Sequence, residues 1–451
     1  MKITIIDSII CKADKELIQH ITPCLQYPQV FWKQGPYKRT QKKSIGYFIH
    51  KGTGVFLTGL LPKVRDFLFD KKIQYSLEGS LNWIDPDNEP HLKGITLRPD
   101  QMKLIGRMEH FHRGIIISPT GSGKTIIALG FMSMFPEAKI LFLCHTLDLI
   151  DQTIDELKKF GFRNVSKLGS GNKKWKGSRI VVSTIQTFIK LDPEEYCDYF
   201  DITIIDEAHH CVDRKGQYGT VMQSNLSPVK IGFTATLPKG QQKLLSMEGL
   251  LGPVIGEVTI QEGIDLKIMA KPTITLVSIP YSTKISGHTK YQDLYSKGIV
   301  NNRTRNKIIS GLVKDRTEED KTVLIMVKEI VHGENIQKIA KDIYDIDIEF
   351  VRGSTDSEAR NLTKKLFNQK KIKAVISTAV WREGVNIPTL DCIINAVGGK
   401  SEIMTLQAIG RGLRKTDEKD TVEIIDFLDP YRYLAEHCIQ RLNVYKNNNW
   451  L

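Results

Sequence analysis

The sequence predicts an α/β fold with two tandem parallel-sheet lobes, preceded by a small basic α+β domain. Three observations carry this prediction: a glycine-rich loop, two series of short β-branched runs spaced by helical patterns, and an N-terminal segment without acidic residues. Short apolar runs that alternate with helices are typical of parallel sheets buried on both faces. At roughly 100–200 residues per domain, a chain of 451 residues allows two to four domains.

The N-terminal segment from Leu17 through Arg65 contains no Asp or Glu, and aromatic residues are interleaved with its basic ones. The stretches Ser44–Ile49 and Gly54–Thr58 predict a small twisted antiparallel sheet, followed by a helix over Pro62–Phe69. A net charge of +13 favours a polyanionic partner, nucleic acid before an anionic membrane surface. A merely solvated basic face is the alternative. The candidate DNA contacts here are Lys33, Lys38, Arg39, Lys42 and Lys43.

A polar, breaker-rich run from Asp85 to Pro90 predicts the first domain boundary. Two series of buried strands follow, and they are joined near Ala270. The first series is Gly114–Ile117, Ile140–Leu143, Ile180–Ser183, Ile202–Ile205 and Ile231–Phe233, and the second is Ile274–Ile279, Val323–Met326, Ile348–Val351, Ala374–Ser377, Cys392–Asn395 and Thr421–Ile425. We therefore expect domains at 1–90, 91–270 and 271–425, and a C-terminal helix over 426–451 that packs back on the lobes.

The run from Ser118 to Thr125 (SPTGSGKT) follows a predicted strand and opens a predicted helix, as a phosphate-binding loop requires. Glycines let backbone N–H groups close around phosphates, and a helix N-terminus adds partial positive charge. Ser118 stands where the common pattern has Gly, but the cradle is made mainly by Gly121 and Gly123. A plain glycine turn is the alternative. The predicted nucleotide-binding residues of this loop are Thr120, Gly121, Ser122, Gly123, Lys124 and Thr125, with Lys124 on the β/γ-phosphates and Thr125 on Mg²⁺.

The run Asp206-Glu207-Ala208-His209 ends the predicted strand Ile202–Ile205. An acid at the carboxyl end of a strand beside the phosphate loop is placed to orient Mg²⁺ through Asp206. Glu207 is then positioned as general base for the attacking water. A helix cap is the alternative for these residues taken alone. His210 and Cys211 suggest a metal site, but no further Cys/His cluster lies near them in the sequence.

A second segment without Asp or Glu runs from Leu157 to Leu191. Its lysines include Lys173 and Lys174, which are candidate DNA contacts, and Gly169–Asn172 predicts a turn.

Together, over about Ile95 to Phe427, these motifs resemble a superfamily 2 helicase of the DEAH-box type. The resemblance implies two RecA-like lobes, with ATP and Mg²⁺ as cofactors. Leu97–Gln101 resembles the segment that reads adenine, through Gln101 with Arg98. Thr234-Ala235-Thr236 resembles the motif that couples hydrolysis to movement. The nucleic-acid contacts that the resemblance implies are His145, Thr146, Thr184, Gln186 and Thr378.

The second lobe contributes a motif resembling the one that touches both strand and nucleotide, with Gly384 and Asn386, and a run from Gln407 to Arg414 that resembles the arginine-finger motif. Arg411 and Arg414 lie three residues apart on one predicted helix face, so both guanidinium groups can point at one anion. An arginine delivered to the transferred γ-phosphoryl group is worth ~10³–10⁵ in rate. A surface salt bridge is the alternative for Arg411.

Ahead of the motor, Phe31–Gly35, Lys51–Gly52 and Gly59–Pro62 resemble phage branch-migration helicases of the UvsW kind, in the T-odd coliphage version. The resemblance implies ATP-dependent remodelling of branched DNA in recombination, repair or replication. An ATP-dependent RNA helicase is one alternative. A non-catalytic annealing protein is another, although the intact motifs argue against it.

Seven cysteines form no CxxC pair, so neither a zinc ribbon nor a disulfide framework is indicated. We expect them to be small buried hydrophobes in a reducing compartment. The N-terminus has an aspartate within its apolar stretch and no cleavage pattern, and no window approaches ~18 apolar residues, so neither a signal peptide nor a membrane span is expected. We expect a cytoplasmic monomer (host cytoplasm if phage-encoded), with branched, duplex and single-stranded DNA and recombination or replication proteins as partners.

Overall fold

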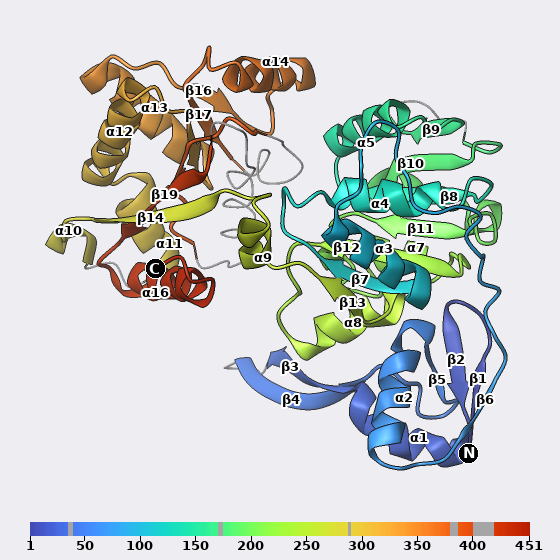
Figure 1. The fold of residues 1–451 in the computed structure, drawn as a ribbon. Helices are drawn as coiled ribbons and strands as arrows, with labels where there is room; N and C mark the ends of the chain where they lie inside the picture. Colours follow the sequence, from blue (N-terminus) through green and yellow to red (C-terminus); the bar gives the residue numbers. More distant parts are fainter. Residues whose placement is uncertain (35–38, 170–174, 287–289, 379–386, 400–418) are drawn as a thin grey trace. The chain divides into compact units, whose positions relative to one another are not determined.

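The computed structural model describes the chain except residues 35–38, 170–174, 287–289, 379–386 and 400–418 (Figure 1). The chain divides into two compact units. The first comprises Met1–Ser118 and Gly123–Val258, and the second comprises Pro119–Ser122 and Thr259–Leu451. The N-terminal segment therefore shares one unit with the first parallel sheet, and the division at Thr259 precedes the join expected near Ala270.

The N-terminal segment forms a small sheet of strand order β5-β2-β1-β6 and a separate two-stranded ribbon, β3-β4. The bounds are β1 Lys2–Ile5, β2 Ile10–Ala13, α1 Lys15–Ile21, η1 Thr22–Leu25, β3 Gln26–Gln34, β4 Arg39–Tyr47, β5 Val55–Leu57, η2 Thr58–Leu60, α2 Leu61–Asp70 and β6 Ser76–Glu78. The expected helix is confirmed as α2. The expected antiparallel pairing of the two stretches is confirmed at an isolated bridge between Ile49 and Phe56. Beyond that bridge the expectation is wrong: β4 belongs to the ribbon rather than to the sheet of β5, and β6 pairs with β1 in parallel.

The first lobe contains a seven-stranded sheet of order β13-β7-β12-β11-β8-β10-β9, and every pairing in it is parallel. The strands are β7 Arg113–Ile117, β8 Ile140–Cys144, β9 Val165–Leu168, β10 Ile180–Thr184, β11 Ile202–Ile205, β12 Val229–Thr234 and β13 Val254–Glu257. The helices are α3 Pro99–Phe111, α4 Lys124–Ser133, α5 Leu147–Lys159, α6 Ile185–Phe188, η3 Pro193–Glu195, η4 Ala208–His210, α7 Gln217–Met222 and α8 Gln241–Leu251. The five predicted strands are confirmed. The sequence missed β9 and β13 because edge strands need no continuous apolar run.

The second unit contains a six-stranded parallel sheet of order β14-β19-β18-β15-β17-β16. The strands are β14 Lys271–Ser278, β15 Val323–Met326, β16 Glu349–Val351, β17 Ala374–Ser377, β18 Cys392–Asn395 and β19 Thr421–Leu428. The helices are α9 Ile260–Asp265, α10 Thr283–Ser286, α11 Tyr291–Tyr295, η5 Ser296–Val300, α12 Arg303–Glu318, α13 Ile330–Tyr344, α14 Ser357–Asn368 and α16 Arg432–Asn447. The predicted fold, two parallel-sheet lobes after a small α+β region, is confirmed.

The C-terminal helix does not begin at Asp426 as expected. Residues through Leu428 extend β19, which pairs with β14 as far as Ser278, and α16 begins only at Arg432. The buried Asp426 carboxylate accepts hydrogen bonds from Arg441 at 2.8 and 2.9 Å and from the Tyr445 hydroxyl at 2.6 Å. These bonds fasten α16 to the strand that precedes it, so the helix packs on the second lobe.

Five of the seven cysteines are buried, Cys24 and Cys197 are partly exposed, and all seven are free thiols. Within the described ranges, no helix combines the length and the apolar character that crossing a membrane requires.

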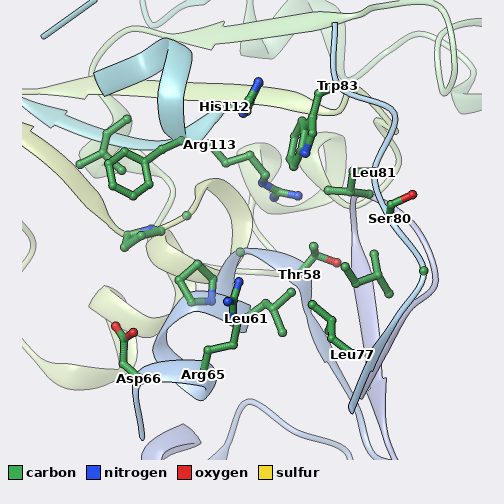
Figure 2. A pocket seen from close by; sticks show the side chains of 18 of the residues that line it. Thr58, Leu61, Arg65, Asp66, Leu77, Ser80, Leu81, Trp83, His112 and Arg113 are labelled. Atoms are coloured by element: carbon green, nitrogen blue, oxygen red, sulfur yellow. The ribbon is translucent and has the colours of Figure 1, made fainter. Parts of the chain in front are cut away.

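A buried arginine joins the N-terminal sheet to the first lobe. Arg113 lies at the start of β7 and is 7% exposed. Its Nη1 donates to the Ser8 carbonyl, its Nη2 to Leu250 O at 3.2 Å and its Nε to Leu251 O at 3.5 Å. Arg113 lines a hollow of about 1170 Å³, and Figure 2 shows Arg65 of α2 on the other side of it. One guanidinium group thus satisfies carbonyls from both sides of the junction.

Replacing Arg113 by methionine should lower the free energy of unfolding by about 3 kcal/mol, because the buried carbonyls lose their donor. Urea denaturation followed by circular dichroism measures the loss. The exposed Arg65, at the same hollow, provides the control: Arg65→Met should change stability by less than about 0.5 kcal/mol. Equal effects of the two substitutions would show that Arg113 does not hold the junction.

Candidate functional site

The predicted motifs of the first lobe meet at one edge of its sheet. Strand β12 pairs with β7 on one side and β11 on the other, and β8 follows β11. Because carboxyl ends of parallel strands lie at the same edge, the loops that follow these strands are neighbours. They carry the glycine-rich loop after β7, Asp206-Glu207 after β11, Thr234–Thr236 at the end of β12 and His145 after β8.

The glycine-rich loop has the backbone that an anion-binding loop requires. Gly121 has φ 91° and Gly123 has φ 99°, values in the left-handed region that residues with a Cβ rarely adopt. The Ser122 hydroxyl donates to Pro119 O at 2.7 Å within the loop. Helix α4 starts at Lys124, immediately after Gly123, so its first N–H groups have no acceptor within the helix and favour an anion.

Lys124, Glu207, His209 and Thr234 form a connected chain of polar side chains. Lys124 Nζ lies 3.9 Å from Glu207 Oε1, and Glu207 Oε2 lies 3.3 Å from His209 Nδ1. His209 Nδ1 is also 3.3 Å from Thr234 Oγ1, which donates to Thr236 O at 2.9 Å. Contacts therefore run without a break from the phosphate loop through the acidic motif to the loop after β12.

Among the described residues, three buried polar atoms in or beside this series of side chains lack hydrogen-bond partners: the Lys124 ammonium, Glu207 Oε2 and the Thr236 hydroxyl. An ammonium group has three donors and no acceptor, so a buried one with no acceptor within hydrogen-bond distance is unfavourable unless a ligand supplies the acceptors. Lys124 is the first residue of α4 and follows the glycine-rich loop directly. The phosphates of a nucleotide would lie within that loop, next to the Lys124 ammonium. The residues present therefore fit a nucleoside triphosphate.

The two adjacent carboxyl groups have opposite pKa shifts. Burial, with the charge of Glu207 beside it, raises the pKa of Asp206 above its ordinary value. Burial alone would also raise the pKa of Glu207, but the Lys124 ammonium and His209 outweigh it and lower that pKa. Glu207 is 7% exposed and has a left-handed backbone with φ 55° and ψ 49°. A strained backbone that holds an ionised, buried carboxylate is a feature of functional sites.

Thr125 and Asp206, the predicted Mg²⁺ ligands, come from the first turn of α4 and the end of β11. Thr125 is half-buried, and the Asp206 Oδ1 atom accepts a hydrogen bond from Glu207 N at 3.0 Å. Hydroxyl and carboxylate oxygens are the donor atoms that Mg²⁺ prefers. Their roles as ligands stay a prediction.

The predicted adenine-reading residues lie at the start of α3. Gln101 Oε1 accepts from Arg98 N at 3.0 Å, and the Arg98 guanidinium binds the Asp100 carboxylate at 2.9 and 3.0 Å. Gln101 is 2% exposed, and its Nε2 is 2.9 Å from the point where a Cβ on Gly123 would stand. The structure thus brings Gln101 to the phosphate loop, while its role in reading a base stays a prediction.

His145, predicted to contact nucleic acid, stacks on His210 with ring centroids 3.9 Å apart and planes 9° from parallel. Burial lowers the pKa of His210 to about 3, which keeps its imidazole neutral. The sequence analysis did not predict this stack, nor the contact of His209 with Thr234. Both depend on the strand order, which places β8, β11 and β12 side by side.

The other predicted nucleic-acid residues occupy several environments. Thr184 is buried and caps α6, accepting from Thr187 N at 3.3 Å, whereas Gln186 in the same helix is exposed. Thr146 stands at the N-cap position of α5, and its side chain makes no capping hydrogen bond there. Thr378, buried after β17 in the second unit, donates its N–H to Val351 O at 3.3 Å. In the N-terminal ribbon Lys43 is exposed.

The remaining predicted site residues fall where the structure gives no placement. The side chains of Lys33, Arg39 and Lys42 are not described, although their backbones form β3 and β4. The residues outside the described ranges are Lys38, Lys173, Lys174, Gly384, Asn386, Gln407, Arg411 and Arg414.

Replacing Lys124 by alanine should weaken triphosphate binding by about 10–100-fold, because the substitution removes a charge-assisted hydrogen bond to the phosphates. Titration with a fluorescent ATP analogue measures the affinity. Lys103→Ala removes an exposed lysine on α3 and serves as the matched control. Unchanged nucleotide affinity of the Lys124 variant would contradict the assignment of the loop.

A parallel sheet that carries a phosphate-binding loop and a buried carboxylate pair at one edge, followed by a second parallel-sheet unit, defines a nucleotide-hydrolysing motor of two RecA-like lobes. The sequence matches the family described as "Type III restriction enzyme, res subunit" over residues 94–239 and the "Helicase conserved C-terminal domain" over residues 304–416. The chain belongs to the superfamily 2 helicases and is an ATP-dependent enzyme.

Individual proteins that are similar to this chain are also named as helicases or translocases. The chain is 28% identical to the ATP-dependent DNA helicase uvsW of Enterobacteria phage T4 over 75% of this chain and 72% of that protein. It is 26% identical to the DNA 3'-5' translocase XPB2 of Sulfurisphaera tokodaii over 79% of this chain and 86% of that one. The crystal structure of DUF1998 helicase MrfA bound to DNA has a TM-score of 0.58 and 16% identity, over 80% of this chain and 56% of that one, and shows likeness of fold.

Proposed function

We propose that this protein is an ATP-dependent DNA helicase or translocase that remodels branched DNA, such as forks, Holliday junctions and displacement loops, in recombination, repair or replication. The observation that carries the motor activity is the unbroken chain from Lys124 through Glu207 and His209 to Thr234. DNA is favoured because the phage and archaeal relatives are named as DNA enzymes. Branched DNA is favoured by the resemblance of the N-terminal segment to phage branch-migration helicases.

In this proposal, each residue of the site has a separate task. ATP with Mg²⁺ supplies the phosphoryl group to be transferred and a Lewis acid that polarises it. Lys124 binds the phosphates, and Thr125 and Asp206 hold the ion. Glu207, kept ionised by Lys124 and His209, orients the attacking water and accepts its proton. In the second lobe, Gln407, Arg411 and Arg414 stabilise the charge of the transferred group.

The N-terminal ribbon supports contact with nucleic acid. Strands β3 and β4 pair antiparallel from Gln26↔Tyr47 to Gln34↔Arg39, and the ribbon includes the basic run from Arg39 to Lys43. Near its base, Lys51 Nζ lies 3.6 Å from the centroid of the Tyr47 ring. Lysines interleaved with aromatic rings suit a nucleic-acid strand, because phosphates and bases find partners together. We further propose that the protein acts as a cytoplasmic monomer.

A panel of DNA and RNA substrates tests the proposal. Forks, four-way junctions, partial duplexes and single strands of DNA, with matching RNAs, are scored for stimulation of ATP hydrolysis and for ATP-dependent unwinding. Stimulation by DNA with unwinding of forks and junctions is expected. Stimulation by RNA alone would replace the proposal with an RNA helicase. If neither DNA nor RNA supported ATP hydrolysis, the remaining explanation would be a non-catalytic annealing protein.

Substitution tests the ribbon better than truncation does, because the core of the N-terminal segment is continuous with that of the first lobe. For duplex DNA, log affinity falls as log salt concentration rises. The double variant Lys42→Gln/Lys43→Gln should make this fall less steep, by about 1–2 in the magnitude of the slope. The paired variant Lys71→Gln/Lys72→Gln, at the exposed end of α2, is the control. An unchanged slope for the ribbon variant would contradict the ribbon's role.

A further inference from the structure

A second polar cavity lies in the first unit, where the base of the β3-β4 ribbon meets the first lobe. Its volume is about 590 Å³, within the ~300–1,000 Å³ typical of small-ligand pockets. We call it the ribbon-base pocket. The side chains that matter for its chemistry are Tyr27, Tyr47, Phe48, Arg214, Lys215 and Ser246.

One wall of the ribbon-base pocket is aromatic and held in place by a glycine. The rings of Tyr27 and Phe48 pack with centroids 5.3 Å apart. Tyr27 lies opposite Gly46 in the ribbon, and a Cβ on Gly46 would stand 2.2 Å from the Tyr27 ring. Only glycine therefore lets this ring lie across β4. Tyr47 completes the wall, with the Lys51 ammonium over its ring.

The opposite wall carries positive charge. The Arg214 guanidinium lies 5.7 Å from the Phe48 ring centroid and donates to Gln223 Oε1 at 3.3 and 3.4 Å, which fixes its orientation. Lys215 is exposed beside it. Asp213 is the carboxylate among the described lining residues, and its Oδ1 accepts from Lys215 N at 2.9 Å. Including Lys51, cations outnumber carboxylates here.

A buried serine, Ser246, lines the same cavity. It lies inside α8 and is 1% exposed, and its Oγ has no hydrogen-bond partner among the described residues. A serine within a helix commonly donates to the carbonyl four residues earlier, so the unpaired state of this hydroxyl is unusual. Buried polar groups are normally paired, and an exception calls for an explanation. A ligand with an acceptor oxygen in the cavity provides one.

We propose that the ribbon-base pocket binds one nucleotide unit, a phosphate with its base, from a DNA strand that follows the ribbon. The base would stack on the aromatic wall, Arg214 and Lys215 would neutralise the phosphate, and Ser246 would donate to an acceptor on the nucleotide. The inference rests on the proposed function, because a bound DNA strand supplies the nucleotide unit. A free nucleotide has the same chemistry, so the experiment must distinguish it from a nucleotide of a DNA strand.

The pocket also adjoins the segments that carry the hydrolytic motifs. Arg214 and Lys215 follow η4, which begins directly after Glu207. Ser246 belongs to α8, the helix after the Thr234–Thr236 loop. A nucleotide seated here would contact two segments that follow, in the sequence, the motifs of the ATP site.

Ser246→Ala gives a sharp test, because loss of an unpaired buried hydroxyl should leave the protein equally or more stable. We expect its affinity for a fluorescein-labelled dT₁₂ strand, measured by anisotropy, to fall about 10-fold, and its thermal midpoint not to fall. Ser224→Ala, which removes a partnered hydroxyl at the end of α7, is the control and should bind as wild type.

Lys215→Gln should reduce the slope of log affinity against log salt for dT₁₂ by about 0.7, whereas Lys243→Gln, an exposed lysine of α8 outside the pocket, should not. Wild-type affinity and slope in both the Ser246 and Lys215 variants would overturn the inference. Absence of DNA binding by the wild-type protein would instead contradict the proposed function. Titration with dTMP separates the sources: binding of dTMP that depends on Ser246, with dT₁₂ binding unaffected, would assign the site to free nucleotide.

Discussion

Glu207→Gln is expected to bind ATP with unchanged affinity and to lose about 10²–10⁴ in the rate of hydrolysis. The amide has the shape of the carboxylate but cannot accept a proton from water. Its surroundings in the structure show why the carboxylate matters. The side chain is buried, Lys124 Nζ stands 3.9 Å from one oxygen, and His209 stands 3.3 Å from the other, so the group is held ionised and oriented.

Phosphate release at saturating ATP and DNA measures the rate of this variant, and a fluorescent nucleotide measures its affinity. Glu194→Gln, an exposed carboxylate at η3, is the matched control and should hydrolyse ATP as wild type. A Glu207 variant with undiminished turnover would remove Glu207 from the role of general base. Loss of nucleotide affinity instead would indicate that Glu207 serves mainly to hold Lys124.

Arg411→Ala should bind ATP and DNA and yet lose ~10³–10⁵ in DNA-stimulated hydrolysis, the worth of an arginine that stabilises the transferred phosphoryl group. Arg411→Lys should rescue little, because an ammonium lacks the fork of donors that matches a phosphoryl group. This prediction rests on the sequence motif, since residues 400–418 lie outside the described ranges.

Arg432→Ala provides the control for the arginine variant, because Arg432 is an exposed arginine at the start of α16. Single-turnover hydrolysis with and without a DNA fork separates loss of chemistry from loss of binding. If Arg411→Ala hydrolysed ATP at the wild-type rate with DNA present, the arginine-finger role would be wrong.

The largest part of the fold was predictable because parallel sheets have a simple local signal. Strands such as β8 and β15 are buried on both faces, so each is a continuous apolar run that can be recognised without knowing its neighbours. The edge strand β9 alternates buried and half-buried residues over only four positions, and that pattern is too short to detect. The end of β19 was mistaken for helix because its pairing with β14 is a long-range contact.

The nucleotide site was predictable for a related reason. Lys124 and Glu207 each follow an apolar strand, and parallel strands place their carboxyl ends at one edge, so local sequence and one rule of topology bring them together. The placement of Gln101 against Gly123 and of His145 on His210 did not follow from that rule. The resemblance supplied roles for Gln101 and His145, but not these contacts.

The two parallel sheets, the phosphate loop and the acidic pair followed from the sequence alone, because each depends on a few consecutive residues and a local backbone preference. Three contacts could be learned only from the folded molecule: Arg113 joins the N-terminal sheet to the first lobe, His209 meets Thr234, and Ser246 of α8 lines a cavity together with residues of the ribbon. Those contacts join segments far apart in the chain, and their distances depend on strand order and on how whole elements pack, which no local pattern of residues encodes.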